Sequence, residues 1–167
     1  MHIRGPAHSN QSTREHGGRG AGELFFPCSL APLPPAAFTR EQTVNACETV
    51  RAYFEALTAG DAQQLIALMS RAPYGVKIGT DENEFVEGGE NASNYYRHHT
   101  DSTDDFTITF DHLDVQERDT VAWFYTRQTW DLNWQGKREK LAMRLTGVLE
   151  REKGQWKFVQ IHASLGV

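Results

Sequence analysis

Residues 39–167 are predicted to form one α+β domain, in which helices pack on a curved, mainly antiparallel sheet. Two observations predict this class. Apolar residues first recur at three- and four-residue steps, the period of a helix, and from residue 106 they alternate with polar residues, the period of a strand. The predicted order is helix, helix, strand, helix and then four strands in a meander. Helices segregated from an antiparallel sheet define an α+β domain.

Residues 1–38 differ in composition from the rest of the chain. They contain three histidines, the cluster Gly-Gly-Arg-Gly at 17–20 and four prolines between 27 and 35, with no helical or strand period. Such a composition is typical of a flexible leader, and we expect residues 1–38 to be disordered. The spacing of the histidines is irregular and they lack Cys or Asp partners, so it does not indicate a metal site.

Helix signals open the predicted domain. Thr39 and Gln42 match a capping box and predict a helix of about 20 residues. Gly60 ends this helix, and Asp61 caps a second helix that ends at Pro73. The apolar face of the first helix consists of Val44, Cys47, Val50, Phe54 and Leu57.

The strands follow in order. A short strand is predicted at 74–79, and a third helix at 90–99. Alternating residues then predict strands that begin near residues 106 and 121, the second of which runs to about residue 134. Gln135-Gly136 and Lys153-Gly154 are turn pairs, and they separate the last two strands, at 138–152 and 156–164.

Five short segments in this order resemble the SnoaL-like branch of the nuclear transport factor 2-like superfamily. They are Ala-Gly-Asp at 59–61, Ile-Gly-Thr-Asp at 78–81, Val-Ala-Trp at 121–123, Arg-Leu-Thr-Gly-Val-Leu-Glu-Arg at 144–151 and Trp-Lys-Phe-Val-Gln-Ile-His-Ala-Ser at 156–164. The resemblance implies a cone-shaped fold around a pocket. It implies no single activity, because the superfamily includes ketosteroid isomerases, polyketide cyclases, dehydratases, epoxide hydrolases and association domains.

The last two predicted strands place polar residues on one face. A tight turn makes them antiparallel, so we expect Arg144 opposite His162 and Thr146 opposite Gln160, with Ser164 at the same end. Polar groups that converge at one end of an apolar face are typical of a ligand pocket. A slip of one residue would exchange the two faces, so the face that lines the pocket stays open at this point.

Two residues are candidates for proton transfer. His162 is one, because an imidazole can take and return a proton near neutral pH, and Asp81 is the other, because it follows a strand end, where a carboxylate faces a cavity mouth. The alternatives are a histidine packed in the sheet or at a dimer face, and an aspartate that caps its own loop through the amides of residues 83 or 84. The guanidinium of Arg144 could hold a carboxylate or enolate oxygen, or form a salt bridge.

The predicted ligand contacts combine polar groups with an aromatic wall. They are Arg144, Thr146, Ser164, Tyr95, Trp123, Tyr125 and Trp130. The resemblance implies acid–base isomerisation, cyclisation, dehydration or hydrolysis of a small hydrophobic compound, without a cofactor. The alternative is a non-catalytic binding or association module, with a homodimer formed across exposed aromatics such as Trp130 and Trp134.

The net charge and the distribution of apolar residues exclude several classes of partner. The net charge of −5 gives no basic surface for nucleic acid, and the sequence has no run of 18 apolar residues that could span a membrane. No spacing typical of a metal site, phosphate loop or nucleophile elbow is present, so no metal is expected. Cys28 and Cys47 could form a disulfide, but we expect both to be thiols, which favours a cytoplasmic location.

Overall fold

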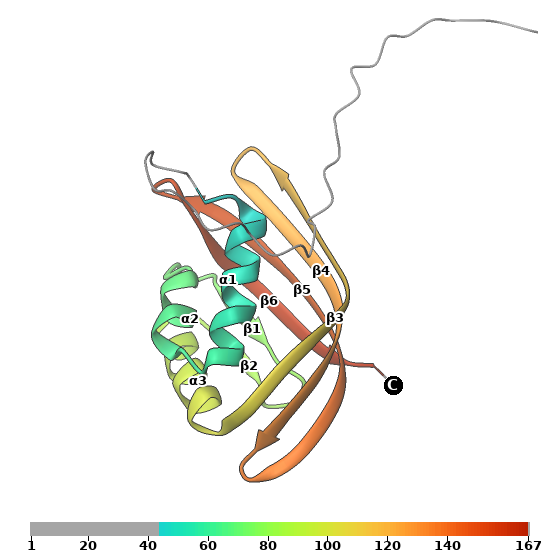
Figure 1. Cartoon of the computed structure of the whole chain (residues 1–167). Coiled ribbons are helices and arrows are strands. Elements are labelled where there is room, and N and C mark those ends of the chain that lie inside the picture. The colour runs from blue at the N-terminus through green and yellow to red at the C-terminus, as the bar shows by residue number, and fades with distance from the viewer. Residues whose placement is uncertain (1–43, 167) are drawn as a thin grey trace, which may run out of the picture.

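The computed structural model describes residues 44–166, which form three helices and six strands (Figure 1). The helices are α1 (Ala46–Ala59), α2 (Ala62–Leu68) and α3 (Gly89–Asp101). The strands are β1 (Val76–Ile78), β2 (Phe85–Glu87), β3 (Thr103–Arg118), β4 (Val121–Trp134), β5 (Lys137–Glu152) and β6 (Gln155–Leu165). The predicted α+β class and order are confirmed, with one addition. The three-residue strand β2 was not predicted, because it is too short to show a period.

The start of α1 differs from the prediction. The Asn45 carboxamide oxygen accepts the Glu48 N–H at 2.8 Å, and the Glu48 carboxylate accepts the Asn45 N–H at 3.0 Å, so the capping box lies here. Asn45 is extended, so no helix continues through it from Thr39, which lies outside the described residues. Gly60, in the left-handed region at φ +66°, ends α1, and Asp61 caps α2, both as predicted.

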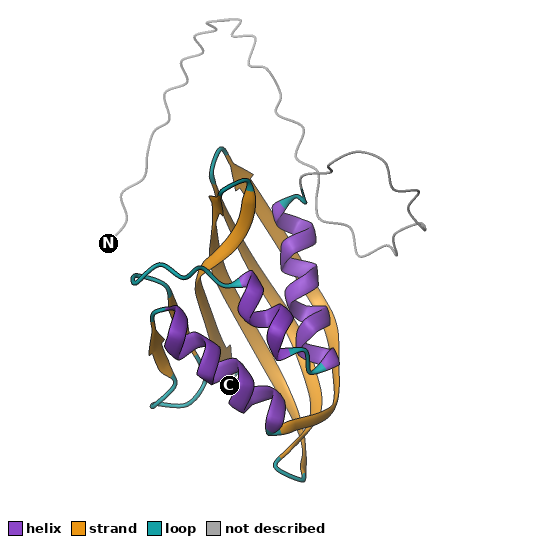
Figure 2. Ribbon diagram, turned by 90° about the vertical axis from the view of Figure 1, so that its left-hand side faces the viewer, coloured by secondary structure: helices purple, strands orange, loops and turns teal. Residues whose placement is uncertain are grey.

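All six strands belong to one sheet in the order β2-β1-β6-β5-β4-β3. Strand β1 pairs with β6 in parallel, and every other neighbouring pair is antiparallel. The sheet is curved, and all three helices lie on the same face of it (Figures 1 and 2). We call this the inner face and the opposite one the outer face. The core lies between the inner face and the helices, and its most deeply buried members include Val50, Tyr53, Leu65, Tyr96, Phe124, Leu145, Leu149 and Ile161.

Two hairpin turns have the conformation that their residues favour. In Gln135-Gly136 and in Lys153-Gly154, both residues have positive φ, between 49° and 82°. This is the conformation of a two-residue type I′ turn, whose twist matches that of the flanking strands. Glycine adopts it without strain, and the predicted turns are confirmed.

The register of the last hairpin differs from the prediction by two residues. Arg144 lies opposite Ser164, and Thr146 lies opposite His162. The turn joins the strands with only two residues, and Val159 bulges out of β6, so the ladder is shifted. A shift of two residues keeps the same side chains together. They lie, however, on the outer face, which the helices do not cover.

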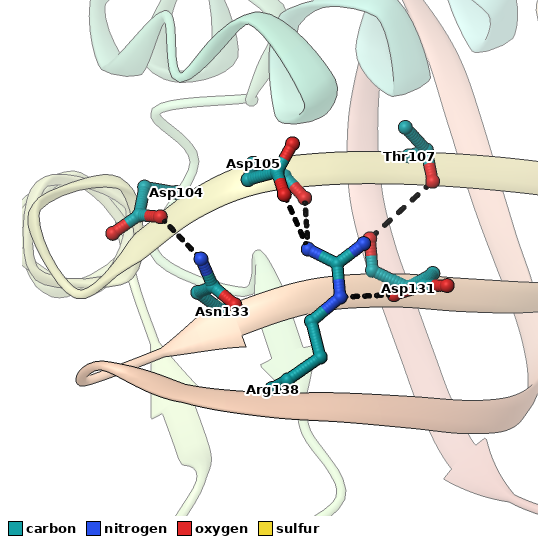
Figure 3. A network of polar contacts seen from close by, with 6 residues as sticks. All are labelled: Asp104, Asp105, Thr107, Asp131, Asn133 and Arg138. Atoms are coloured by element: carbon teal, nitrogen blue, oxygen red, sulfur yellow. Dashed lines mark hydrogen bonds and ion pairs between the residues drawn. The ribbon is translucent and has the colours of Figure 1, made fainter.

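A polar network joins the start of β3 to the β4–β5 hairpin (Figure 3). The Arg138 guanidinium donates to the carboxylates of Asp105 and Asp131, each at 2.6 Å. Asn133 donates to the Asp104 carboxylate at 2.8 Å, and the ladder is irregular between Asp104 and residue 107. Asp105 has φ +47°, so the ion pair holds a backbone conformation that non-glycine residues seldom adopt.

Three further expectations concern the leader, the cysteines and membrane-spanning helices. The leader at 1–38 and Cys28 lie outside residues 44–166. Within the described range no cysteine is free, so the expectation of a thiol at Cys47 is wrong, and the argument from thiols to the cytoplasm no longer holds. None of the described helices has the length and apolar character needed to cross a membrane.

Candidate functional site

A cavity of about 350 Å³ lies between the inner face of the sheet and the side chains of α1 and α3. This volume is within the range of small-molecule sites. Aromatic and aliphatic side chains make most of its wall. The lining residues that carry charged or titratable groups are Tyr53, Lys77, Asp81, Glu84, Tyr95, Tyr96, His99 and Glu139.

Lys77 enters the cavity because of the parallel pairing of β1 with β6. It lies beside Ile161, whose side chain is buried on the inner face, so Lys77 points inward as well and is only 5% exposed. Its Nζ donates to the Ile78 carbonyl at 3.1 Å and lies 5.2 Å from the centroid of the Tyr95 ring. Burial lowers the pKa of Lys77 to about 8, although the Glu84 carboxylate raises it in part.

The Glu84 carboxylate is held by three donors. One oxygen accepts the N–H groups of Thr80 at 2.8 Å and Asp81 at 3.1 Å, and the other accepts the Tyr95 hydroxyl at 3.3 Å. Burial, together with this carboxylate, raises the pKa of Tyr95, so its hydroxyl stays protonated. Glu84 therefore ties the loop at 79–84 to α3 and places an ordered anion at the cavity wall.

His99 lies in an aromatic enclosure on the last turn of α3. It is 7% exposed, and its ring stacks on Tyr95 with 6.0 Å between centroids and lies 5.7 Å from the Trp134 ring. Its Nε2 is buried and has no hydrogen-bond partner among the described residues. Burial and, to a smaller extent, the nearby charge of Lys77 lower the pKa of His99 to about 4, so the imidazole is neutral at pH 7. An unpaired buried polar atom costs about 1–3 kcal/mol.

Other buried polar groups of the lining have partners within the protein. The Tyr96 hydroxyl donates to the Tyr53 hydroxyl at 3.3 Å, and burial raises the pKa of both. The indole N–H of Trp130 donates to Gln128 Oε1 at 2.6 Å. The unpaired atom of His99 therefore distinguishes it from these neighbours.

The predicted site residues divide between the two faces of the sheet. Asp81, Tyr95 and Trp130 line the cavity. The others lie on the outer face, away from it, and they are His162, Arg144, Thr146, Ser164, Trp123 and Tyr125. The structure thus does not bring His162 and Asp81 together.

Several of these residues have local partners. Asp81 accepts the Asn83 N–H at 3.1 Å, which is the loop-capping alternative considered from the sequence. Arg144 donates to the Leu165 carbonyl at 2.7 Å, and Tyr125 donates to the Asp114 carboxylate at 2.7 Å. The expected dimer contact across exposed Trp130 and Trp134 is wrong for these residues. Trp130 is 8% exposed and Trp134 is half-buried, and both face the cavity.

Sequence reasoning missed Lys77, Glu84 and His99. A signal existed for His99, because it follows Tyr95 and Tyr96 at helical spacing and shares their buried face. No local signal existed for Lys77. Alternation in β1 would favour Val76 and Ile78 as the buried residues, and only the pairing with β6 reverses this.

Comparison with known proteins agrees with the fold. The SnoaL-like domain family matches residues 47–167. A candidate dehydratase of the NTF2-like family from Streptomyces avermitilis has a TM-score of 0.61 and 19% identity, over 71% of this chain and 91% of that one. A ketosteroid isomerase-like protein from Erwinia carotovora atroseptica has a TM-score of 0.60 and 17% identity, over 71% of this chain and 92% of that one.

A candidate calcium/calmodulin-dependent protein kinase II association domain from Xanthomonas campestris gives a TM-score of 0.58 and 25% identity, over 73% of this chain and 89% of that one. No curated protein sequence matches the chain. The similarities to the dehydratase and the isomerase-like protein are similarities of fold. The family match covers most of the chain, and the chain therefore belongs to the SnoaL-like domain family, with the fold of NTF2-like proteins.

Proposed function

We propose that the cavity binds a small, uncharged, largely apolar molecule and promotes acid–base chemistry on it, of the isomerase, cyclase, dehydratase or hydrolase kind. The observation that supports this most strongly is the buried, unpaired Nε2 of His99 in an aromatic cavity that also holds Lys77. Nε2 is almost inaccessible from the cavity, so a polar ligand atom would supply the missing partner once a small turn of the His99 ring exposes it. The ligand would thereby remove a cost that the empty protein bears.

The charges around the cavity favour an uncharged ligand. The described lining residues include three carboxylates, on Asp81, Glu84 and Glu139, against the one lysine, Lys77. A ligand with a carboxylate or phosphate would meet more negative than positive charge, which disfavours binding. Flat aromatic walls instead favour an apolar ring system.

The proposed chemistry uses an oxygen atom of the ligand near Lys77 and His99. Both side chains offer N–H donors, and donors fixed in a water-poor site stabilise negative charge that develops on oxygen. Asp81, exposed in the loop at 79–84, is the proposed proton acceptor. Tyr95 and Trp130 form the wall against the ligand.

The proposal predicts that enlarging an alanine inside the cavity weakens ligand binding, whereas enlarging an alanine outside the cavity does not. Ala163 lines the cavity, so A163L fills part of it, whereas Ala142 is exposed on the outer face, so A142L does not. A screen of neutral aromatic fragments that includes naphthalene-2-methanol, measured by thermal shift and NMR, should find binders to the wild type and to A142L. Their affinity for A163L should fall at least tenfold. Equal affinity for both variants would contradict the proposal.

A second candidate function is dimeric association, and the outer face favours it. Trp123 is 37% exposed and Tyr125 is 44% exposed, side by side with Val121 on β4. Fold similarity to an association domain agrees with such a role. We propose that a second copy of this chain covers these side chains in a homodimer. W123E should then sediment as a monomer, while an unchanged sedimentation coefficient would contradict this interface.

A further inference from the structure

We propose that Lys77 forms a covalent imine with an aldehyde or ketone bound in the cavity. This inference rests on the proposed function, because it names the ligand class of the same cavity. It also gives the lysine a role beyond hydrogen bonding.

The surroundings of Lys77 do not resemble those of a structural lysine. Buried lysines are normally paired with a carboxylate, because an unpaired buried charge is costly. No carboxylate of the described residues lies within ion-pair distance of Nζ, and its one hydrogen bond to them is to the Ile78 carbonyl. The carboxylate that acts on its charge, Glu84, is hydrogen-bonded to Thr80, Asp81 and Tyr95 instead. The amine is thus buried at the cavity wall without a carboxylate paired to it.

The same environment supplies the reactive form of the amine. Imine formation needs the uncharged amine, which carries the lone pair. With a pKa of about 8, roughly a tenth of Lys77 is uncharged at pH 7, whereas an exposed lysine is uncharged in well under one molecule in a thousand. Of the titratable groups around the amine, Glu84 favours the charged form, and His99 is itself neutral. Tyr95, below the amine, also stays neutral.

The proposed step balances without any co-reactant. The lone pair of Nζ attacks the carbonyl carbon and a C–N bond forms, while the oxygen gains a proton and the nitrogen loses one, giving a carbinolamine. The hydroxyl group then takes a proton and leaves as water, and a C=N bond remains. Neutral His99 has one nitrogen that accepts a proton and one that donates, which suits both transfers. The protonated imine acidifies the adjacent C–H, whose proton Asp81 would take.

Reductive trapping tests the inference on the full chain. The protein is incubated at pH 7.5 with 2-naphthaldehyde and sodium cyanoborohydride, and labelled lysines are mapped by peptide mass spectrometry. We expect Lys77 to be labelled at least tenfold faster than Lys140, which is exposed on β5. Excess naphthalene-2-methanol, of similar size but unable to form an imine, should protect Lys77 and leave Lys140 unaffected.

Two variants separate the amine from its charge. K77R keeps a cation but removes the nucleophile, and K140R is the matched control. K77R should lose the fast-labelled site, while K140R should retain it together with binding of naphthalene-2-methanol, measured by NMR. Labelling of Lys77 no faster than of Lys140, with the alcohol still bound, would overturn the imine and leave the proposed function standing. Absence of both labelling and alcohol binding would overturn the two together.

Discussion

The carboxylate of Glu84 occupies the space that a side chain on Gly79 would fill. From this position it accepts the N–H groups of Thr80 and Asp81 and the hydroxyl of Tyr95. The absence of a Cβ on Gly79 therefore allows the loop at 79–84 to fold over its own carboxylate and reach α3. This places Asp81 at the cavity and Glu84 near Lys77.

Replacement of Gly79 by alanine should destabilise the protein. A Cβ would displace the Glu84 carboxylate from its three donors, and hydrogen bonds to a charged group are worth about 1.5–3 kcal/mol each before partial replacement by water. We expect G79A to lower the free energy of unfolding by roughly 2–4 kcal/mol in urea denaturation. In an E84G background, which also removes the Glu84 Cβ that the new methyl group would meet, the same substitution should cost less than about 1 kcal/mol. An equal cost in both backgrounds would show that Glu84 is not the cause.

Replacement of Lys77 by methionine should stabilise the protein at pH 7. Methionine fills a similar volume without a buried, unpaired charge, so we expect the free energy of unfolding to rise by about 1–3 kcal/mol. Chemical denaturation measures the change, and K140M on the outer surface should alter it by less than about 0.5 kcal/mol. A loss of stability in K77M would mean that the lysine is retained for structure rather than for function.

The advantage of K77M should disappear at high pH. The pKa of Lys77 is about 8 in the folded protein and 10.5 at its ordinary value, so between these pH values the unfolded chain holds more protons. Wild-type stability therefore rises with pH in this window, by up to about 3 kcal/mol. The difference between wild type and K77M should narrow from pH 8 to pH 10.5. A constant difference would contradict the lowered pKa.

His99 should make the protein sensitive to acid. Its pKa is about 4 in the folded protein against an ordinary 6.5, so the unfolded chain binds the proton first as the pH falls. Between pH 6.5 and pH 4 the wild type should lose up to about 3 kcal/mol relative to H99F, which does not titrate there. Denaturation curves at several pH values measure this. An NMR titration that found a His99 midpoint near 6.5 would contradict the buried, neutral imidazole.

The ion-pair network around Arg138 should contribute modestly to the stability of the protein, and this contribution should depend on the salt concentration. Its carboxylate partners, Asp105 and Asp131, are 70% and 38% exposed in their side chains, so water screens the attraction (Figure 3). We expect a double-mutant cycle of D105N and R138Q to give a coupling of about 0.5–1 kcal/mol. In 1 M salt the coupling should fall to less than half. A coupling unchanged by salt would indicate that the network acts through packing.

The sequence predicted what depends on local rules. Helical spacing in α1, alternation in β4 and the turn pairs at Gln135 and Lys153 each follow from neighbouring residues. The parallel pairing of β1 with β6 joins segments far apart in the chain, and the bulge at Val159 alters the ladder without a composition signal. These two features decide which side chains of β1 and β6 point inward.

Because these features are not visible in local patterns, the sequence predicted only part of the candidate site. The polar face around His162 has the composition of a pocket, but the helices cover the opposite face. Lys77 points inward because β1 pairs with β6 so that it lies beside the inward-facing Ile161. Alternation within the three residues of β1 does not predict this burial. Tyr95 and Trp130, predicted as ligand contacts, and Asp81, predicted as catalytic, do line the cavity.

An NMR titration of the histidine imidazoles tests the central claim most directly. Naphthalene-2-methanol is added to 15N-labelled protein, and the ring nitrogens of His99 and His162 are followed in one spectrum. If the cavity is the ligand site, the His99 nitrogens shift and saturate as Nε2 gains a partner, while His162 on the outer face stays unchanged. A saturating shift of His162 with His99 unmoved would contradict the account and place the ligand on the outer face.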